Sequence, residues 1–145
     1  MVKEKADSVS KKSNGEAKII IAGDFNCTPD DNEIAILTGN DEKLNSPENI
    51  SMINLSELSA DKGLGTYKYM GTWEMIDQVI VSEPFLKCHS GYYTGDSLLT
   101  VFRPDFLLQR DQSYPGFRPF STYLGYRYQG GFSDHLPVIL ELRLK

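Results

Sequence analysis

The chain has 145 residues, of which 40% are hydrophobic and 11% aromatic, enough apolar material for one globular domain with a core. Its formal net charge of −5 means that the chain as a whole does not attract a polyphosphate backbone at long range. The polar start, Met1 to Lys18, lacks the apolar segment of a signal peptide or a membrane span. The composition predicts a single domain over residues 1–145, with a helix or polar lead-in over residues 1–17.

The N-terminal third predicts two helices around one strongly apolar strand. Val2 to Ser13 can form a first helix, although it has few apolar positions. Ile19 to Ala22 is a continuous apolar run rich in β-branched residues, which predicts a strand covered on both faces. Thr28 and Pro29 then supply an N-cap and a first-turn proline for a second helix from Asp30 to Thr38.

Shorter elements are predicted for the middle of the chain. We expect a polar loop over Asp41 to Pro47 and a short helical turn over Ile53 to Leu58. Thr66 to Tyr69 and Trp73 to Val81 have the composition of two strands joined by a glycine turn, which indicates a hairpin. Leu86 to Tyr93 predicts a further strand.

Residues 101–132 combine basic and aromatic side chains in an unusual density. The segment holds most of the chain's aromatic residues together with Arg103, Arg110, Arg118 and Arg127. Its prolines and glycines make it too irregular for a regular element, so we expect a long ordered loop. Basic residues interleaved with aromatic rings suit phosphate or base contacts, which makes Arg118 and Arg127 candidate substrate-binding residues. The alternative is that the rings bury one another and anchor the loop.

Three short polar motifs each lie at the end of an apolar strand. In Gly23-Asp24-Phe25-Asn26, the side chains of Asp24 and Asn26 project to the same side if the backbone stays extended. Asp77 lies inside an otherwise apolar run and needs a partner, because an unpaired buried carboxylate costs several kcal/mol. Asp134 and His135 directly precede a strand in which apolar side chains alternate from Val138 to Leu142.

In this order the three motifs resemble those of the endonuclease/exonuclease/phosphatase family, which has the DNase I-like fold. The resemblance covers Ile19 to Leu144 and corresponds to the C-terminal half of that family's domain. It implies an α+β fold with one mainly antiparallel β-sheet and helices on one face, which is half of a four-layer α/β/β/α sandwich. The inner face of such a sheet would be open, and an open apolar face is an interaction surface.

The resemblance also implies roles for individual residues. Asp24 would orient or deprotonate the attacking water, and Asn26 would hold that water or a phosphate oxygen. Asp77 would pair with His135 and fix its tautomer, and His135 would contact the scissile phosphate. Asp134 would bind the metal. Carboxylates approach a phosphate ester only with a cation between them, and oxygen ligands favour Mg²⁺ or Mn²⁺ over zinc.

These expectations define two hypotheses. The first is the C-terminal part of a divalent-metal-dependent phosphoesterase that hydrolyses a phosphodiester or phosphomonoester by metal-assisted water attack. Two family positions, a metal-binding Glu and a second catalytic His, have no counterpart here, so we expect the chain alone to be inactive. The second is a non-catalytic half-domain that self-associates or binds a partner through its open sheet face. The expected partners are a phosphorylated substrate, whether nucleic acid, inositol phosphate or phospholipid, and either the missing N-terminal half or a second copy in a homodimer.

Overall fold

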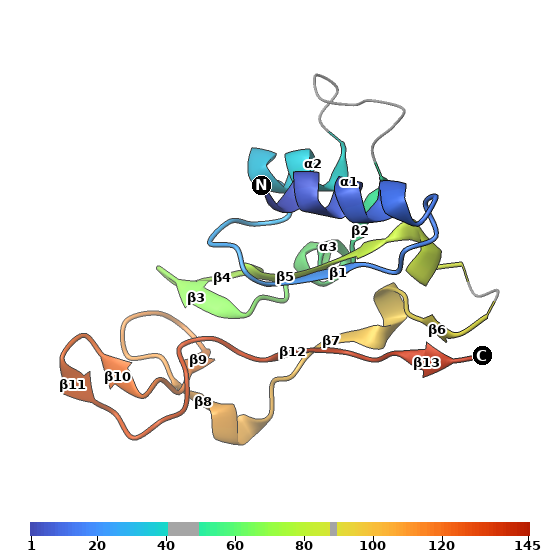
Figure 1. The fold of residues 1–145 in the computed structure, drawn as a ribbon. Coiled ribbons are helices and arrows are strands. Elements are labelled where there is room, and N and C mark those ends of the chain that lie inside the picture. Colours follow the sequence, from blue (N-terminus) through green and yellow to red (C-terminus); the bar gives the residue numbers. More distant parts are fainter. Residues whose placement is uncertain (41–49, 88–89) are drawn as a thin grey trace.

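The structure, a computed structural model, describes residues 1–40, 50–87 and 90–145 of an α+β chain. Helices, a central sheet and a ribbon of short strand pairs are stacked in three layers (Figure 1). The predicted loop from Asp41 to Pro47 lies outside the described residues. None of the helices in the described ranges has the length and hydropathy needed to cross a membrane.

The elements are short, as the many turn residues of the sequence require. The helices are α1 (Val2–Lys12), α2 (Asn32–Thr38) and α3 (Glu57–Asp61). The strands of the first half are β1 (Ile20–Asp24), β2 (Met52–Asn54), β3 (Tyr67–Tyr69), β4 (Thr72–Glu74) and β5 (Asp77–Ser82). The strands of the second half are β6 (Tyr92–Tyr93), β7 (Leu99–Val101), β8 (Leu108–Arg110), β9 (Phe117–Pro119), β10 (Tyr123–Leu124), β11 (Arg127–Tyr128), β12 (Val138–Leu140) and β13 (Arg143–Leu144). Single 3₁₀ turns cover Glu83–Phe85, Asp96–Leu98 and Asp105–Leu107.

The central sheet has the order β1-β5-β2, and both pairs are antiparallel. β5 is buried from Gln78 to Ser82 because it has neighbours on both edges and layers on both faces, which explains its nearly continuous apolar sequence. Side chains alternate between the two faces, so Ile80 faces one layer while Val79 and Val81 face the other. This alternation divides the core into two clusters.

The first cluster lies between the central sheet and helices α1 and α2, which cover one face of the sheet (Figure 1). Its buried residues are Ala6, Ile34, Leu37, Ile50, Met52 and Ile80. Ile21 of β1 and Phe25 pack against it from the strand and the turn that follows. Full burial of an aliphatic side chain contributes about 1.5–3 kcal/mol, so this cluster anchors α1 in spite of its polar sequence.

The second cluster fills the opposite face of the sheet, which the sequence analysis expected to be open. That expectation is wrong for β5 and β2, because β7 and β12 pair with one another and fold beneath them. Val138 and Leu140 of β12 pack against the cluster that contains Val79 and Val81. Their alternation along the strand turns one apolar side toward the sheet. The edge strand β1 keeps exposed positions on this face, where Ile20 is 40% exposed.

The strands do not form one sheet, in contrast to the prediction. The described residues form one three-stranded sheet and separate two-stranded pairs, β3-β4, β6-β13, β7-β12, β8-β9 and β10-β11. Residues 101–132 contain β8 to β11 and are therefore not the strandless loop that was expected. The backbone N–H of Asp111 donates to Gly116 O at 3.0 Å and closes the β8-β9 hairpin. Such short hairpins can include the prolines and glycines that argued against a long strand.

The aromatic rings of this segment follow both predicted alternatives. Phe106 and Phe132 make an edge contact at 5.8 Å between centroids, and Phe120 contacts Phe132 at 6.3 Å, so these rings anchor one another. Tyr123 and Tyr128 pair across β10-β11 at 5.5 Å but stay largely exposed. Phe106 and Phe132 contact one another but are 58% and 61% exposed, so both groups of rings leave surface available to a ligand.

Other predicted boundaries need correction. Residues 53–58, expected as a helical turn, hold the end of β2 and the start of α3. The expected strand from Trp73 to Val81 is broken into β4 and β5, because Met75 and Ile76 are both buried and the chain bends between the layers. The β3-β4 hairpin formed as predicted. Of the expected strand from Leu86 to Tyr93, only β6 is a strand, and residues 88–89 lie outside the described ranges.

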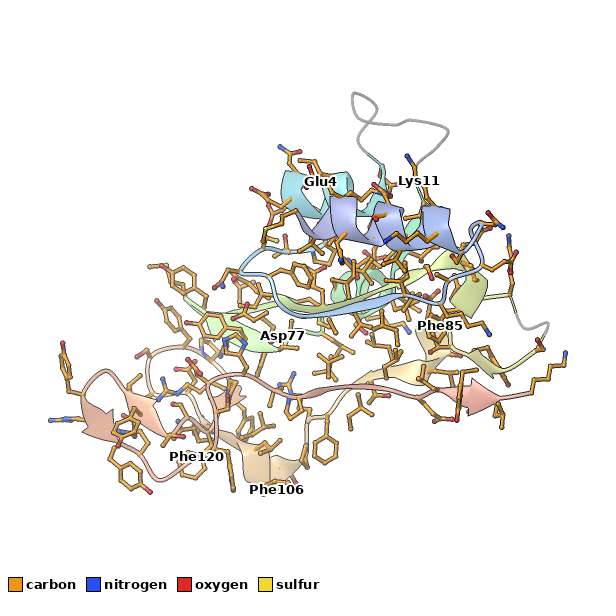
Figure 2. All side chains as sticks on the ribbon, viewed as in Figure 1. Glu4, Lys11, Asp77, Phe85, Phe106 and Phe120 are labelled. Atoms are coloured by element: carbon orange, nitrogen blue, oxygen red, sulfur yellow. The ribbon has the colours of Figure 1, made fainter. Side chains whose placement is uncertain are left out.

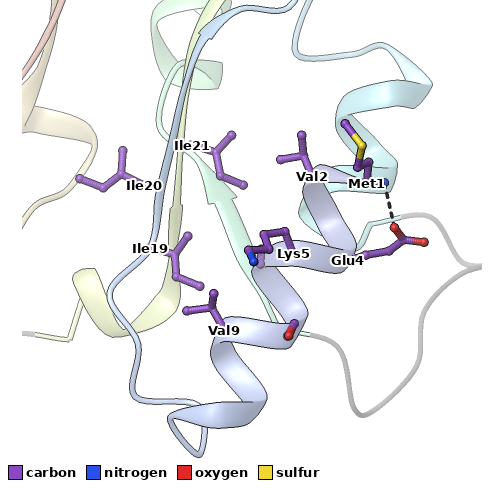
Figure 3. A pocket seen from close by; sticks show the side chains of 10 residues that line it. Met1, Val2, Glu4, Lys5, Val9, Ile19, Ile20 and Ile21 are labelled. Atoms are coloured by element: carbon purple, nitrogen blue, oxygen red, sulfur yellow. Dashed lines mark ion pairs between the residues drawn. The ribbon is translucent and has the colours of Figure 1, made fainter.

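An apolar groove of about 640 Å³ runs between α1 and β1. Figure 3 shows Val2 and Val9 of α1 facing Ile19 and Ile21, whereas Ile20 points to the other side of the strand. Because β1 is the edge of the sheet, its outer backbone groups have no ladder partner in the part of the chain that the structure describes. The groove therefore lies directly beside this open edge.

A buried ion pair predicts how stability depends on pH. Lys68 Nζ lies 3.0 Å from Asp111 Oδ2, and their side chains are only 2% and 6% exposed. The hydrogen bond from Lys68, with backbone N–H donors of Ser113 and Tyr114, lowers the pKa of Asp111 from 3.8 to about 2. Since this pKa is lower in the folded state, the pair contributes stability above about pH 4 that is lost as the pH falls toward about 2.

Asp111→Asn should therefore lower the free energy of unfolding at pH 7, since it leaves a buried ammonium group without its anion. The difference in the free energy of unfolding between Asp111→Asn and the wild type should become smaller between about pH 4 and pH 2, as measured by urea denaturation. Asp105→Asn, an exposed change in the same part of the fold, serves as the control. If this difference in the free energy of unfolding stays constant over the pH range, the Lys68–Asp111 pair is not the cause of the pH dependence.

Candidate functional site

Asp24 ends β1 and Asp77 begins β5, and the two residues are direct cross-strand partners. The neighbouring pair is hydrogen bonded, with Phe25 N donating to Ile76 O at 2.9 Å. In an antiparallel ladder the next pair is then a non-hydrogen-bonded one, whose side chains lie close together on the same face. Like charges in such positions repel one another, so this pair calls for a cation or a proton donor beside it.

His135 lies beside this pair, on the layer beneath the sheet. Its Nδ1 is 2.7 Å from Asp77 Oδ2, and the two side chains are about one quarter exposed. This is the contact that the sequence analysis expected as the reason for a carboxylate in β5. If Nδ1 carries the proton and donates it to Asp77, Nε2 is left to face a ligand. Figure 2 shows Asp77 at the end of the sheet nearest the hairpins β8 to β11.

Thr66 and Tyr67, which the sequence analysis did not assign to the site, hold His135 in place. Leu136 N donates to Thr66 O at 2.8 Å, and Tyr67 forms a single β-bridge with His135. The ring of Tyr67 lies 4.9 Å from the imidazole ring, centroid to centroid. The hydroxyl of Thr66 also accepts a hydrogen bond from Asp77 N at 3.3 Å. The start of β3 is thus connected to both members of the Asp77–His135 pair.

Asn26 occupies the tight turn that follows β1. Its φ of 51° is in the left-handed region, which Asn tolerates better than most residues. Its backbone N–H donates to Asp24 Oδ1 at 2.9 Å, so one oxygen of that carboxylate holds the turn. The turn keeps Asn26 next to Asp24 at the surface, beyond the end of the sheet.

Gln78 is a third residue that the sequence analysis did not assign to the site. Its side chain is 1% exposed and donates from Nε2 to Cys27 O at 2.6 Å, which ties β5 to the turn after Asn26. Asn54 Nδ2 in turn donates to Gln78 Oε1 at 2.6 Å. A polar residue inside an apolar strand, directly after Asp77, was the available signal. Burial, followed by the charges of Asp31, Glu33 and Asp24, raises the pKa of the adjacent Cys27 thiol, so it stays protonated at neutral pH.

Three of the candidate residues form a group of potential metal ligands. One ligand atom each from Asp24, Asp77 and His135 can be chosen so that all lie within 4.8 Å of one another. This group is rich in carboxylate oxygen and fits the donor preference of Mg²⁺ or Mn²⁺. Asp134, expected as the metal ligand, is exposed and is not one of the three; it lines an adjacent pocket together with Arg118. Arg127 lies on the exposed hairpin β10-β11 and does not line that pocket.

The site thus joins a carboxylate pair on strand ends to a histidine from the second β-layer, in the order suggested by the three motifs. The chain belongs to the endonuclease/exonuclease/phosphatase family, whose defining sequence pattern matches residues 1–144. It has no significant match among curated proteins or among solved structures. The family sets the general class of phosphoesterase-type domain.

The hydrogen bonds of Gln78 predict a cost for its replacement. Gln78→Met keeps a similar volume but leaves Asn54 and the carbonyl of Cys27 without their partner, so the free energy of unfolding should fall by about 1–3 kcal/mol. Chemical denaturation measures this change, with Gln112→Met at an exposed position as the matched control. Equal stability of the two variants would show that the contacts of Gln78 do not hold the turn.

Proposed function

We propose that the chain is the catalytic-site part of a divalent-metal-dependent phosphoesterase that hydrolyses a phosphodiester or phosphomonoester by attack of water. The observation that carries the proposal is the Asp77–His135 contact at 2.7 Å, with Asp24 directly opposite Asp77 across the strands. Membership of the endonuclease/exonuclease/phosphatase family supports the same reaction class.

Mg²⁺ or Mn²⁺ is the proposed cofactor, and the residues that would hold it are Asp134 and the oxygens of Asp24 and Asp77 that hydrogen bonds leave available. Bound there, the ion would neutralise negative charge on the phosphate oxygens. Two carboxylates placed opposite one another support this assignment, since a nearby cation removes their repulsion.

The protein's own groups have distinct proposed tasks. Asp24 accepts a proton from the attacking water, and the side-chain amide of Asn26 holds that water or a phosphate oxygen. His135 faces the phosphate through Nε2 and stabilises developing charge, while Asp77 holds Nδ1 and keeps the ring oriented. Asp77 therefore positions His135 with one carboxylate oxygen and would offer the other to the metal.

A second candidate function is a non-catalytic domain that binds a partner or a second copy. The observation that favours it is the open edge of β1 beside the apolar groove, together with the exposed Ile20. An added strand would satisfy the outer backbone groups of β1 and cover apolar surface. Light scattering after size-exclusion chromatography tests this alternative: a stable dimer disrupted by Ile20→Asp would favour it.

Removal of the metal and of Asp134 tests the catalytic proposal. Where hydrolysis of bis-p-nitrophenyl phosphate occurs, in the chain alone or with a separately supplied N-terminal half of the family's domain, it should depend on Mg²⁺ or Mn²⁺ and stop with EDTA. Asp134→Ala should abolish turnover with little loss of stability, because the side chain is exposed in a turn. Asp61→Ala, on the surface of α3, is the matched control. Metal-dependent turnover that survives in Asp134→Ala would exclude the metal role of Asp134, and turnover by the unaltered chain alone would show that the two missing family positions are not required.

Asp77→Asn tests the positioning role. The carboxamide can keep a hydrogen bond to Nδ1 but no longer carries the charge that supports an imidazolium, so turnover should fall roughly 10- to 100-fold. The pH dependence of turnover should also change, which a purely structural role would not produce. Folding should be maintained, since the change removes the repulsion with Asp24. An unaltered rate and pH profile would argue that His135 acts without Asp77.

A further inference from the structure

A pocket of about 250 Å³ lies directly beside the candidate site. Its lining includes Tyr67 from β3, Arg118 from β9, Ser121, Tyr123 from β10 and Asp134. These residues come from the β3-β4 hairpin, from the segment rich in arginine and aromatic residues, and from the motif that contains His135. The pocket therefore exists only because the fold brings three distant parts of the sequence together.

Two residues connect the pocket to the catalytic group. Tyr67 lines the pocket and its ring also contacts the ring of His135, at 4.9 Å between centroids. Asp134 lines the pocket and immediately precedes His135 in the chain. A substrate whose scissile phosphate lies at His135 would therefore extend its organic part into this pocket.

Arg118 supplies the pocket with an oriented positive charge. With the amide oxygen of Gln109 facing the guanidinium, that oxygen accepts from Nε at 3.3 Å and from Nη2 at 3.2 Å. Among the described residues, no ion pair between Arg118 and a carboxylate occurs. The other cation of the pocket, Lys68, is already paired with Asp111 at 3.0 Å. Arg118 thus has a fixed orientation and unused donors, which suits a bound anion.

We propose that Arg118 binds a second phosphate group of the substrate. The inference rests on the proposed function, which places the scissile phosphate at the Asp134 and His135 end of the pocket. Tyr67 and Tyr123 are among the residues that line the space, and their rings would offer contacts to a sugar or cyclitol ring between the two phosphates. The substrate class is then a ring that carries phosphates at two positions, as in a nucleotide unit of a nucleic acid or an inositol polyphosphate. A head group with a quaternary ammonium would meet a like charge at Arg118.

Binding measurements test this proposal without any need for turnover. Isothermal titration calorimetry would compare thymidine 3′,5′-bisphosphate with thymidine 5′-monophosphate, and myo-inositol 1,4-bisphosphate with myo-inositol 1-phosphate. The bisphosphate of at least one pair should bind at least about tenfold more tightly, as expected for an added hydrogen bond between charged groups. The pair of compounds with the larger ratio of affinities shows whether the ring belongs to a nucleotide or to an inositol.

Arg118→Gln should reduce that ratio to near one. Arg110→Gln is the matched control, because Arg110 lies on the same two-stranded sheet, next to Gln109, with its side chain on the opposite face. Circular dichroism and thermal melts establish that both variants fold. Equal binding of both members of each pair, or a preference that persists in Arg118→Gln, would overturn the proposal. Hydrolysis of bis-p-nitrophenyl phosphate, which has a single phosphate, reports separately on the proposed function.

Discussion

The register between β1 and β5 is the constraint on which the site depends, because it places Asp24 opposite Asp77. Two like charges at directly opposite strand positions repel one another. The apolar residues of the same strands oppose this repulsion: Ile80 lies in one cluster and Val79 and Val81 in the other, each contributing about 1.5–3 kcal/mol. A slip of one residue would exchange the two faces and turn Asp77 into the helix-side core. Hydrophobic burial therefore holds the two like charges at the same end of the sheet.

The second β-layer completes the site by supplying His135. Val138 and Leu140 pack under the sheet, and Leu136 binds Thr66, so the turn that carries His135 cannot move independently of the core. The imidazole then lies where a partner for Asp77 is required. The same packing covers most of the face that a half-sandwich would leave open, which restricts the exposed apolar surface of the sheet to its β1 side. Closure of this face and placement of the histidine thus have one physical cause.

The sequence predicted those parts of the structure that are determined by residues close together in the chain. The apolar run of β5 and the alternation of β12 placed two strands, and the carboxylate of Asp77 showed that it needs a partner, but the family resemblance was required to name His135 as that partner. Gln78 was missed because its partners, Asn54 and the Cys27 carbonyl, are distant in sequence, so its polar character inside an apolar strand did not show what it binds. The short pairs within residues 101–132 were missed for a related reason. Each is too short to show a period of two, and its pairing depends on turns and on rings packed from elsewhere.

The net negative charge of the chain does not prevent binding of the proposed anionic ligand, because electrostatic forces act over a limited distance in salt solution. A net charge of −5 opposes long-range attraction of a polyanion, but screening confines such fields to about 8 Å at physiological ionic strength. Within that range, the charges that matter are those of Arg118, the proposed cation and the site carboxylates. A single oriented guanidinium in a pocket of about 250 Å³ provides one anion contact and no extended basic track. Recognition would therefore be limited to the few atoms around the scissile bond, so that even a nucleic-acid substrate would be held through one ring and its two phosphates.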